Sequence, residues 1–458
     1  MFVGRKKELA LLQEHYAKAG SNVLVLYGHK GVGKTTLLMR YAQDKPCFYY
    51  QSIPCAEDEQ VLLWEADLAE NGTDTTSPVP YEGFEAILHR IADTPAESDA
   101  KRILVIDEYQ NIIRNSDSFM AVLMRFLKDS PVPFLVVLAS SSVSFVENDF
   151  VPRIGALALG IGGFFKLQEL GFMDCVNYFG DYSTRDCMEV YSILGGIPAY
   201  WSQFDRSLSV AENVKHGILA KGSFLREEGM RLVAEELREL NVYAVLLNCM
   251  AKGMNKLNDL HMHTGFSRAK ISVYLKNLME RELVEKVFSY DNASTANAKK
   301  GIYRISLRYL QFYFRFLFPH QSALERLDEG EYFRRYVLPG LSSFHQENFR
   351  KVCGEYLGIL NENRMLPIEA VKTGEWVGKE GSIDIVMQNA DWDSLLAFCD
   401  WESGELTSAD LDHDLKIVEK ARLHPDYIYL FANGKFSEDL KLRAQEDSHI
   451  TLIDIDTL

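Results

Sequence analysis

Gly28-His-Lys-Gly-Val-Gly-Lys34-Thr35 is the stretch that decides the fold of this chain, because it matches the pattern G-x-x-x-x-G-K-[ST] at every specified position. The apolar residues 22–27 before it predict a buried strand, and residues 35–42 predict the opening of a helix. In such a strand–loop–helix unit, glycines let backbone N–H groups surround phosphate oxygens, and the positive end of the helix faces the same anion. We therefore expect this loop to bind a nucleoside triphosphate.

The last residues of the loop carry the expected chemistry. Lys34 should reach the β- and γ-phosphates and so serve both binding and catalysis, while the Thr35 hydroxyl should ligate Mg²⁺. ATP and Mg²⁺ are therefore the expected cofactors. The other residues expected to line the nucleotide here are Gly28, His29, Lys30, Gly31, Val32, Gly33 and Thr36.

A second pattern, Arg102-Ile-Leu-Val-Ile-Asp107-Glu108, runs from four apolar residues into two adjacent carboxylates. A buried strand that ends at Asp107 would hold this carboxylate near Mg²⁺, and Glu108 would then polarise the attacking water. The alternative is a strand followed by an ordinary acidic turn. The position of the pair downstream of a phosphate loop favours the catalytic interpretation.

Four segments in this order resemble the archaeal and bacterial ATPase family within the AAA+/STAND group: residues 2–9, the phosphate loop, residues 106–112 and residues 138–143. Members of that family join an ATPase to a winged helix and often to a C-terminal nuclease-like domain of the DUF234 type. The resemblance covers nearly the whole chain.

The resemblance implies roles for residues outside the loop. Ser140 or Ser141 should sense the γ-phosphate, and we assign this catalytic role to Ser140. The sequence Gly195-Gly-Ile-Pro198 resembles the family's GGxP element, so Pro198 should lie against the nucleotide base. The residues implied to lie beside the nucleotide at the N-terminus are Gly4, Arg5 and Glu8.

One departure from the family concerns catalysis. Many relatives carry a Gly-Arg pair where this chain has Leu159-Gly-Ile161-Gly-Gly, so the arginine that would stabilise the transferring phosphoryl group is missing unless Arg153 replaces it. The loss of such an arginine costs about 10³-fold or more in rate. We therefore expect slow hydrolysis, which suits a switch.

Composition narrows the class of protein. A length of 458 residues is typical of about three domains. The seven cysteines show no CxxC spacing, which favours a reduced intracellular protein. The chain starts on an ATPase motif, with no signal peptide expected, and its apolar runs are too short to span a bilayer. We therefore expect a cytoplasmic protein without a membrane segment.

Negative charge is concentrated near the C-terminus. Residues 345–458 hold 11 Lys and Arg against 23 Asp and Glu, whereas the rest of the chain holds 38 against 42. An acidic domain repels phosphate backbones, so a protein partner fits it better than nucleic acid.

The chain is predicted to be an α/β protein in five parts. Residues 1–170 form a P-loop ATPase core with a parallel sheet covered on both faces, and residues 171–236 form a helical lid. Residues 237–318 form a winged helix, residues 319–344 a helical linker, and residues 345–458 a small α/β domain that resembles DUF234. The polar segment 70–80 is expected to be an exposed loop.

The predicted winged helix is a candidate DNA interface. Ser267 should cap a helix at 268–282, and residues 291–300 should form the wing between two strands. The cations that could meet a major groove are Arg268, Lys270, Lys276, Arg281, Lys299 and Lys300. The alternative, which we favour, is an internal or protein-docking role with solvated cations. The aromatic segment 309–318 should be buried, although a base-stacking platform is the alternative.

The C-terminal part resembles a PD-(D/E)xK nuclease fold whose catalytic pattern has degenerated. Asp384 matches the carboxylate required on the first strand. The second strand should end in an acid-x-Lys, but this chain has Phe398-Cys-Asp400-Trp401, so the lysine is absent. Asp400 and Glu402 could still bind a cation. We expect a pseudonuclease or interaction module rather than an active nuclease.

Together the patterns predict an ATP-hydrolysing switch whose nucleotide state controls the winged helix and the acidic C-terminal domain, with its oligomeric state left open. A DNA-binding regulator or ATP-gated nuclease is the first alternative. A scaffold with a vestigial ATPase is the second, and the intact loop and the Asp107–Glu108 pair argue against it.

Overall fold

The computed structural model describes residues 1–73, 80–95, 100–235, 237–290, 301–379 and 381–457. The predicted wing tip at 291–300, with Lys299 and Lys300, lies outside the described residues, as does most of the predicted loop at 70–80. The chain divides into two compact units. The first comprises residues 3–169 and 197–199, and the second comprises residues 1–2, 170–196 and 200–458. None of the described helices is long and apolar enough to cross a membrane.

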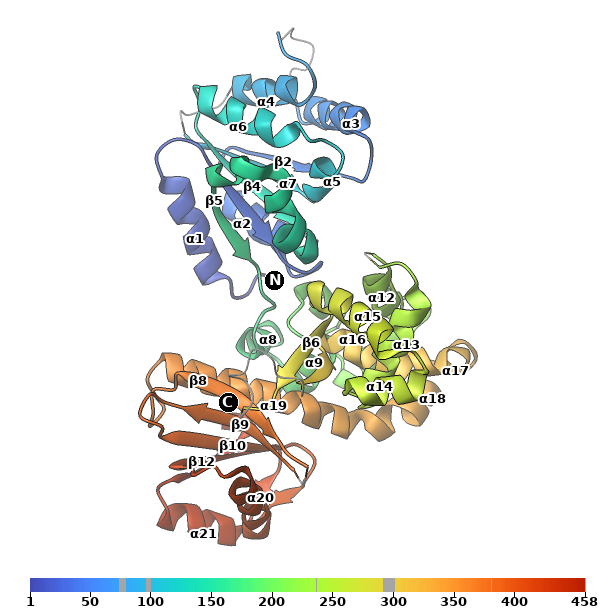
Figure 1. The fold of residues 1–458 in the computed structure, drawn as a ribbon, viewed down its shortest axis with the longest axis vertical. Helices are drawn as coiled ribbons and strands as arrows, with labels where there is room; N and C mark the ends of the chain where they lie inside the picture. Colours follow the sequence, from blue (N-terminus) through green and yellow to red (C-terminus); the bar gives the residue numbers. More distant parts are fainter. Residues whose placement is uncertain (74–79, 96–99, 236, 291–300, 380, 458) are drawn as a thin grey trace. The chain divides into compact units, whose positions relative to one another are not determined.

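The first unit contains a five-stranded parallel sheet, as the sequence predicted (Figure 1). Its strand order is β2-β3-β4-β1-β5, and every neighbouring pair is parallel. Strands β3 and β4 are buried along their whole length, because helices cover both faces of the sheet. The strands are β1 (Asn22–Tyr27), β2 (Cys47–Gln51), β3 (Arg102–Asp107), β4 (Phe134–Ser140) and β5 (Ile161–Lys166).

Side chains of β1 alternate between the two faces of the sheet and pack against different helices on each face. Val23 and Val25 belong to a core cluster with residues of α3, α4 and α6, whereas Leu24 and Leu26 face Leu12 of α1 and Leu37 of α2. The helices are α1 (Lys6–Ala17), α2 (Lys34–Ala42), α3 (Glu57–Glu70), α4 (Gly83–Asp93), α5 (Gln110–Ile113), α6 (Phe119–Asp129) and α7 (Val151–Ile154). Residues 145–150 and 155–160, on either side of α7, form a short π-helix and a short 3-10 helix.

The second unit begins with short helices in the segment predicted to be a lid. Three of them start at serines whose hydroxyls accept from backbone N–H groups three residues later, namely Ser183, Ser209 and Ser223. The helices are α8 (Phe172–Tyr178), α9 (Thr184–Leu194), α10 (Pro198–Trp201), α11 (Val210–Asn213) and α12 (Phe224–Ala234). Residues 197–199, within this segment, pack with the first unit.

Three helices and an antiparallel strand pair follow, in the order predicted for the winged helix. They are α13 (Leu240–Ala251), α14 (Leu257–Thr264), α15 (Arg268–Glu280), β6 (Val284–Phe288) and β7 (Gly301–Ile305). The hydroxyl of Ser267 caps α15 by accepting from the N–H of Lys270. The predicted apolar face of α15 is fully buried and consists of Ile271, Leu275 and Leu278.

The aromatic segment after β7 is buried, as the sequence predicted. Tyr309, Phe312 and Phe314 have at most 1% of their surface exposed, so their rings are not a platform for bases. The helices of this region are α16 (Arg308–Phe312), α17 (Gln321–Arg326), α18 (Glu329–Tyr332) and the long α19 (Leu338–Glu362). Residues 313–317 and 333–337 form short π-helices, and residues 318–320 form a short 3-10 helix.

The C-terminal part is built on a second five-stranded sheet of order β14-β12-β10-β9-β8 (Figure 1). Tyr290, just past β6, contacts the edge of this sheet, since its N–H donates to the carbonyl of Glu375 in β8 at 2.7 Å. The elements are β8 (Lys372–Val377), β9 (Ser382–Gln388), β10 (Ser394–Asp400), β11 (Glu405–Leu406), α20 (Ser408–Ala421), β12 (Tyr427–Ala432), β13 (Lys435–Phe436), α21 (Glu438–Glu446) and β14 (Ile450–Asp454).

Two glycine substitutions should test the packing of the second unit. A Cβ at Gly229 in α12 would overlap the ring of Tyr313, so Gly229→Ala should destabilise the protein by about 1–3 kcal/mol. A Cβ at Gly358 of α19 would have no neighbouring atom within 4 Å, so Gly358→Ala should stabilise the protein by about 0.5–1 kcal/mol through helix propensity. Thermal unfolding midpoints of the two variants should move in opposite directions.

Candidate nucleotide-binding site

The loop between β1 and α2 needs its glycines. A Cβ at Gly28 would overlap the carbonyl oxygen of Leu167, while its N–H donates to the Ser140 carbonyl at 3.2 Å. Gly31 and Gly33 have φ angles of 79° and 99°, which residues other than glycine rarely adopt. The first turn of α2 contains no acidic residue, and Gly33 at its N-cap has no side chain to accept from it. This loop and helix start form a cradle suited to an anion.

Lys34 points into this cradle. Its ammonium donates to the carbonyl oxygens of Gly28 at 2.8 Å and His29 at 3.1 Å, and only 6% of the residue is exposed. Burial lowers the pKa of Lys34, and the carboxylates of Glu108 and Asp107 oppose this shift. A phosphate group bound in the loop would supply the negative charge that favours the ammonium form.

The oxygen atoms expected to ligate Mg²⁺ lie together. The Thr35 hydroxyl donates to Asp107 Oδ2 at 2.6 Å, and the Tyr49 hydroxyl donates to the same oxygen at 3.0 Å. The other carboxylate oxygen accepts from the N–H of Glu108 at 3.0 Å. Hydroxyl and carboxylate oxygens are the donors that Mg²⁺ prefers, so these residues fit the ion. Burial and the neighbouring Asp107 raise the pKa of Tyr49, which keeps it a hydrogen-bond donor.

Glu108 is held in a fixed position after β3. It adopts a left-handed backbone conformation with φ of 52°, and its carbonyl oxygen accepts from the Ser52 hydroxyl at 2.6 Å. Its carboxylate accepts from the N–H and hydroxyl of Ser141, at 3.2 and 2.8 Å, and from the side-chain amide of Gln110. These contacts aim the carboxylate at the end of β4.

Ser140 and Ser141 differ in what their side chains contact. Ser140 is fully buried, and its hydroxyl accepts from the N–H of Ser142 at 3.1 Å. Ser141 instead contacts Glu108. The γ-phosphate-sensing role assigned to Ser140 stays a prediction; of the two serines, Ser141 is the one whose contacts reach Glu108.

The N-terminal residues contact the phosphate loop and hold it in place. Arg5 is buried, and its guanidinium donates to the carbonyl oxygens of Val32 at 3.0 Å and Gln168 at 2.8 Å, while it pairs with Glu8 at 3.0 Å. Gly4 and Arg5 both have positive φ angles, 65° and 64°, which turn the chain toward the loop. Arg5 therefore ties the phosphate loop to the residues that follow β5.

Residues 197–199 lie on the other side of the loop. The N–H of Ala199 donates to the Gly31 carbonyl at 3.3 Å, and Pro198 lies 4.0 Å from the position that a Cβ on Gly33 would occupy. The expected contact of Pro198 with a base stays a prediction, since its described neighbour is the loop itself. Among the other expected loop contacts, His29 is half-buried, whereas Lys30 and Thr36 are exposed.

Arg153 already has a carboxylate partner. Its guanidinium pairs with Asp117 at 2.9 Å and donates to the Arg114 carbonyl at 3.1 Å. These contacts tie α7 to the turn before α6. They give no support to Arg153 as a substitute for the missing catalytic arginine.

Comparison with protein families agrees with this geometry. Residues 2–204 match the model of an ATPase domain found predominantly in Archaea. Residues 313–412 match DUF234, a family of archaeal and bacterial proteins of unknown function. The DUF234 match begins upstream of the boundary that we expected at residue 345 and includes α17 and α18.

Individual relatives extend over different parts of the chain. An uncharacterized protein of Methanocaldococcus jannaschii is 25% identical over 472 residues, which span 100% of this chain and 99% of the relative. An uncharacterized ATP-binding protein of the same organism is 40% identical over 45 residues, 10% of this chain and 76% of the relative. The Walker-type ATPase of Pyrococcus abyssi is similar in fold, with a TM-score of 0.50 and 16% identity over 69% of this chain and 96% of that chain.

The residues compared above with a nuclease pattern lie in the DUF234 region. Asp384 Oδ2 accepts from the N–H of Cys399 at 2.9 Å, and Arg350 of α19 lies 3.4 Å from the other oxygen. Phe398 is buried where an acid would be required. Among the described residues, no group of three or more His, Cys, Asp and Glu side chains could hold a metal ion. Cation binding at Asp400 and Glu402 stays a prediction.

The cations of α15 make contacts within their own segment. Arg268 donates to Asn258 at 2.6 Å, Lys270 lies 4.6 Å from the ring centroid of Phe266, and Lys276 pairs with Glu280 at 3.6 Å. Such contacts are typical of a solvated helix face. They do not distinguish a DNA interface from the docking role.

Asp414 of the DUF234 region should make stability depend on pH. Burial and the neighbouring Asp384, Asp410 and Asp400 raise its pKa from 3.8 to about 7. Since the folded state then binds a proton more tightly than the unfolded state, this group costs stability increasingly as pH rises from about 4 to about 7. Asp414→Asn should raise the unfolding free energy by about 1–3 kcal/mol at about pH 8 and by less at about pH 5.

Thermal unfolding of the wild type and variant at the two pH values checks this. Glu419→Gln on the exposed face of the same helix is the control and should shift neither midpoint appreciably. An equal gain for Asp414→Asn at both pH values would contradict the titration of this carboxyl.

Proposed function

We propose that this protein is an ATP-binding, slowly hydrolysing switch whose nucleotide state controls the winged-helix segment and the acidic C-terminal domain. The observation that carries the proposal is the convergence of Lys34, Thr35 and Asp107 at the end of a P-loop sheet. The match to an archaeal ATPase family supports ATP as the nucleotide.

Each residue has a distinct part in the proposed hydrolysis. Lys34 would exchange its contacts with loop carbonyls for the β- and γ-phosphates. Asp107 and Thr35 would hold Mg²⁺, which when bound neutralises phosphate charge as a Lewis acid. Glu108 would accept a hydrogen bond from the attacking water and orient it, with Ser141 keeping the carboxylate in place.

The lack of an available arginine among the residues expected near the γ-phosphate supports slow turnover. The segment Leu159 to Gly163 provides no arginine, and Arg153 is engaged with Asp117. Without a guanidinium to stabilise the transition state, the rate should be lower by about 10³-fold or more than with one. A long-lived ATP state suits a switch.

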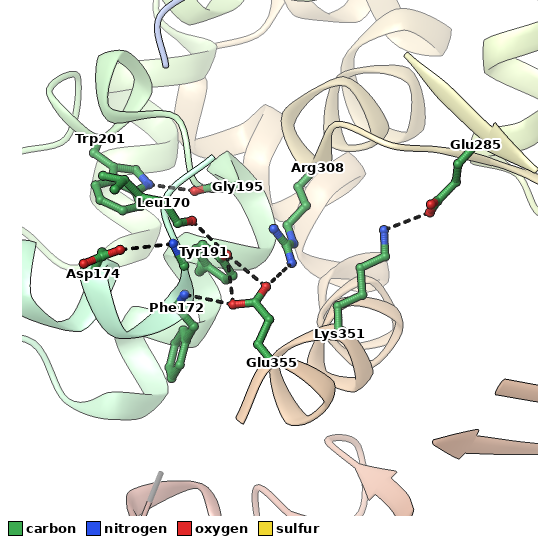
Figure 2. A network of polar contacts seen from close by, with 11 residues as sticks. Leu170, Phe172, Asp174, Tyr191, Gly195, Trp201, Glu285, Arg308, Lys351 and Glu355 are labelled. Atoms are coloured by element: carbon green, nitrogen blue, oxygen red, sulfur yellow. Dashed lines mark hydrogen bonds and ion pairs between the residues drawn. The ribbon is translucent and has the colours of Figure 1, made fainter. Parts of the chain in front are cut away.

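Contacts inside the second unit support transmission from the lid to the DUF234 region (Figure 2). Glu355 of α19 accepts from the N–H of Phe172 at the start of α8 at 3.0 Å, and it lies 3.0 Å from the Tyr191 hydroxyl of α9. Arg308 of α16 pairs with the same carboxylate at 3.2 Å. One carboxylate thus joins lid helices, the helix after the winged-helix segment, and α19.

The same proposal includes a protein partner at the acidic C-terminal domain and a cytoplasmic location. The net negative charge of residues 345–458 supports a partner with a basic surface. The AAA+ resemblance adds oligomer formation to the proposal, and light scattering with and without ATP tests it.

Two substitutions in the site should separate binding from hydrolysis. Lys34→Ala should abolish ATP binding, because it removes the cation of the phosphate cradle. Glu108→Gln should retain binding and lower kcat by about 10²–10⁴-fold, because the amide cannot act as a base. Calorimetric titration with ATP and Mg²⁺ measures the first effect, and single-turnover phosphate release measures the second.

A matched control is Glu82→Gln, an exposed carboxylate of the same unit, which should leave both quantities unchanged. Wild-type turnover by Glu108→Gln would exclude this residue as the base. Unimpaired ATP binding by Lys34→Ala would contradict the assigned site.

The alternative of a DNA-acting protein is separately testable. If α15 docks on protein, the double variant Lys270→Ala/Lys276→Ala should bind duplex DNA no more weakly than the wild type does. A DNA regulator would instead lose affinity in the variant and bind with a steep salt dependence between about 50 and 200 mM. Fluorescence anisotropy of a labelled duplex distinguishes the two.

A further inference from the structure

A cavity of about 370 Å³ lies in the second unit, between the winged-helix segment and the DUF234 region. It is bounded by the end of α13, by β7, α19, β8 and β9, and its volume falls in the usual range for small-molecule sites. Three cations line it, Arg304, Arg350 and Lys351, together with the three carboxylates of Glu347, Glu375 and Asp384.

Part of the charge in this cavity is already balanced. Arg304 pairs with Glu375 at 2.7 Å, and Glu347 pairs with Arg315 at 2.6 Å. Arg350 and Lys351, which are consecutive on α19, lie farther from their carboxylate partners, at 3.4 Å from Asp384 and 3.5 Å from Glu285.

Arg350 has an unused hydrogen-bonding edge. Its Nε lies 3.4 Å from Asp384 Oδ1, and within the described residues its guanidinium makes no hydrogen bond. The edge formed by the two terminal nitrogens therefore stays available for an acceptor. A guanidinium edge of this kind binds carboxylate or phosphate oxygens in pairs.

Lys351 supplies a second cation to the same cavity. Figure 2 shows its side chain extending from α19 toward Glu285 of β6, at an Nζ–Oε1 distance of 3.5 Å. Burial and the nearby Arg308 lower the pKa of Lys351, while Glu285 opposes the shift. An anion in the cavity would stabilise the charged form of this lysine.

We propose that this cavity binds a small phosphorylated molecule, with the phosphate between Arg350 and Lys351. Arg350 and Lys351, both of which line the cavity, favour a doubly charged phosphate monoester over a singly charged carboxylate. The cavity has room for an organic group beyond the phosphate, against the apolar side chains of Met250, Ile305 and Ile385. The site is separate from the phosphate loop and independent of the proposed hydrolysis.

The test is calorimetric titration of the full-length Lys34→Ala protein, in which the phosphate loop is disabled, with inorganic phosphate, glycerol 3-phosphate and AMP. At least one should bind. Arg350→Gln in this background should weaken binding by about tenfold or more, as expected for loss of a charged paired contact. Asp384→Asn should tighten it, because a negative charge near the guanidinium is removed.

A purely structural role of these residues would not make Arg350→Gln weaken ligand binding while Asp384→Asn tightens it. If Arg350→Gln is unstable because Asp384 is left as an unpaired charge, the double variant Arg350→Gln/Asp384→Asn removes both charges and replaces it in the test. The double variant should still bind the ligand more weakly than Asp384→Asn does. Arg326→Gln, an exposed arginine outside the cavity, is the control. ATP turnover of otherwise wild-type Arg350→Gln should be unchanged.

The three ligands identify the source of the phosphate. Tighter binding of AMP or glycerol 3-phosphate assigns the site to an organic phosphate, and equal affinities assign it to inorganic phosphate. Binding that is undetectable, or that is the same in Arg350→Gln, Asp384→Asn and their parent, overturns the proposal.

Discussion

The carboxylate of Asp107 is the constraint on which the nucleotide site depends. It accepts from Thr35 at the start of α2, from Tyr49 in β2 and from the backbone that follows β3. The sheet order makes this possible, since β4 lies between β1 and β3 and all the strands end at the same edge. A shift in any of these elements would separate the loop from the acidic pair.

Sequence patterns predicted the parts of this site that depend on local chain geometry. The apolar runs before Gly28 and Asp107 predicted β1 and β3, because buried parallel strands are apolar throughout. The contact of Tyr49 with Asp107 could not be predicted, since it depends on the register that pairs Gln51 with Asp107. The orientation of Ser141 toward Glu108, and of Ser140 away from it, likewise depends on how the turn after β4 folds.

In the DUF234 region, residue types predict that nuclease chemistry is absent, but they did not predict the contacts of the residues concerned. Comparison of Phe398 and Asp400 with the required acid-x-Lys was enough to show the missing lysine. The pairing of Asp384 with Arg350 joins a strand to a helix far earlier in the chain, and no spacing rule links them. Similarly, the hydrogen bond from Tyr290 to the edge strand β8 has no sequence signal, because it depends on tertiary contact.

The single-turn helix α10 belongs to both units. It starts at Pro198, and the residues on either side of Pro198 contact Gly31 of the phosphate loop. It ends at the fully buried Trp201, whose indole donates to the Gly195 carbonyl at 2.7 Å. A gene fragment that stopped at residue 169 would therefore encode a sheet whose phosphate cradle is left uncovered on one side. The candidate nucleotide site is discontinuous in sequence, and its smallest complete version includes residues 197–199, beyond the last strand of the sheet.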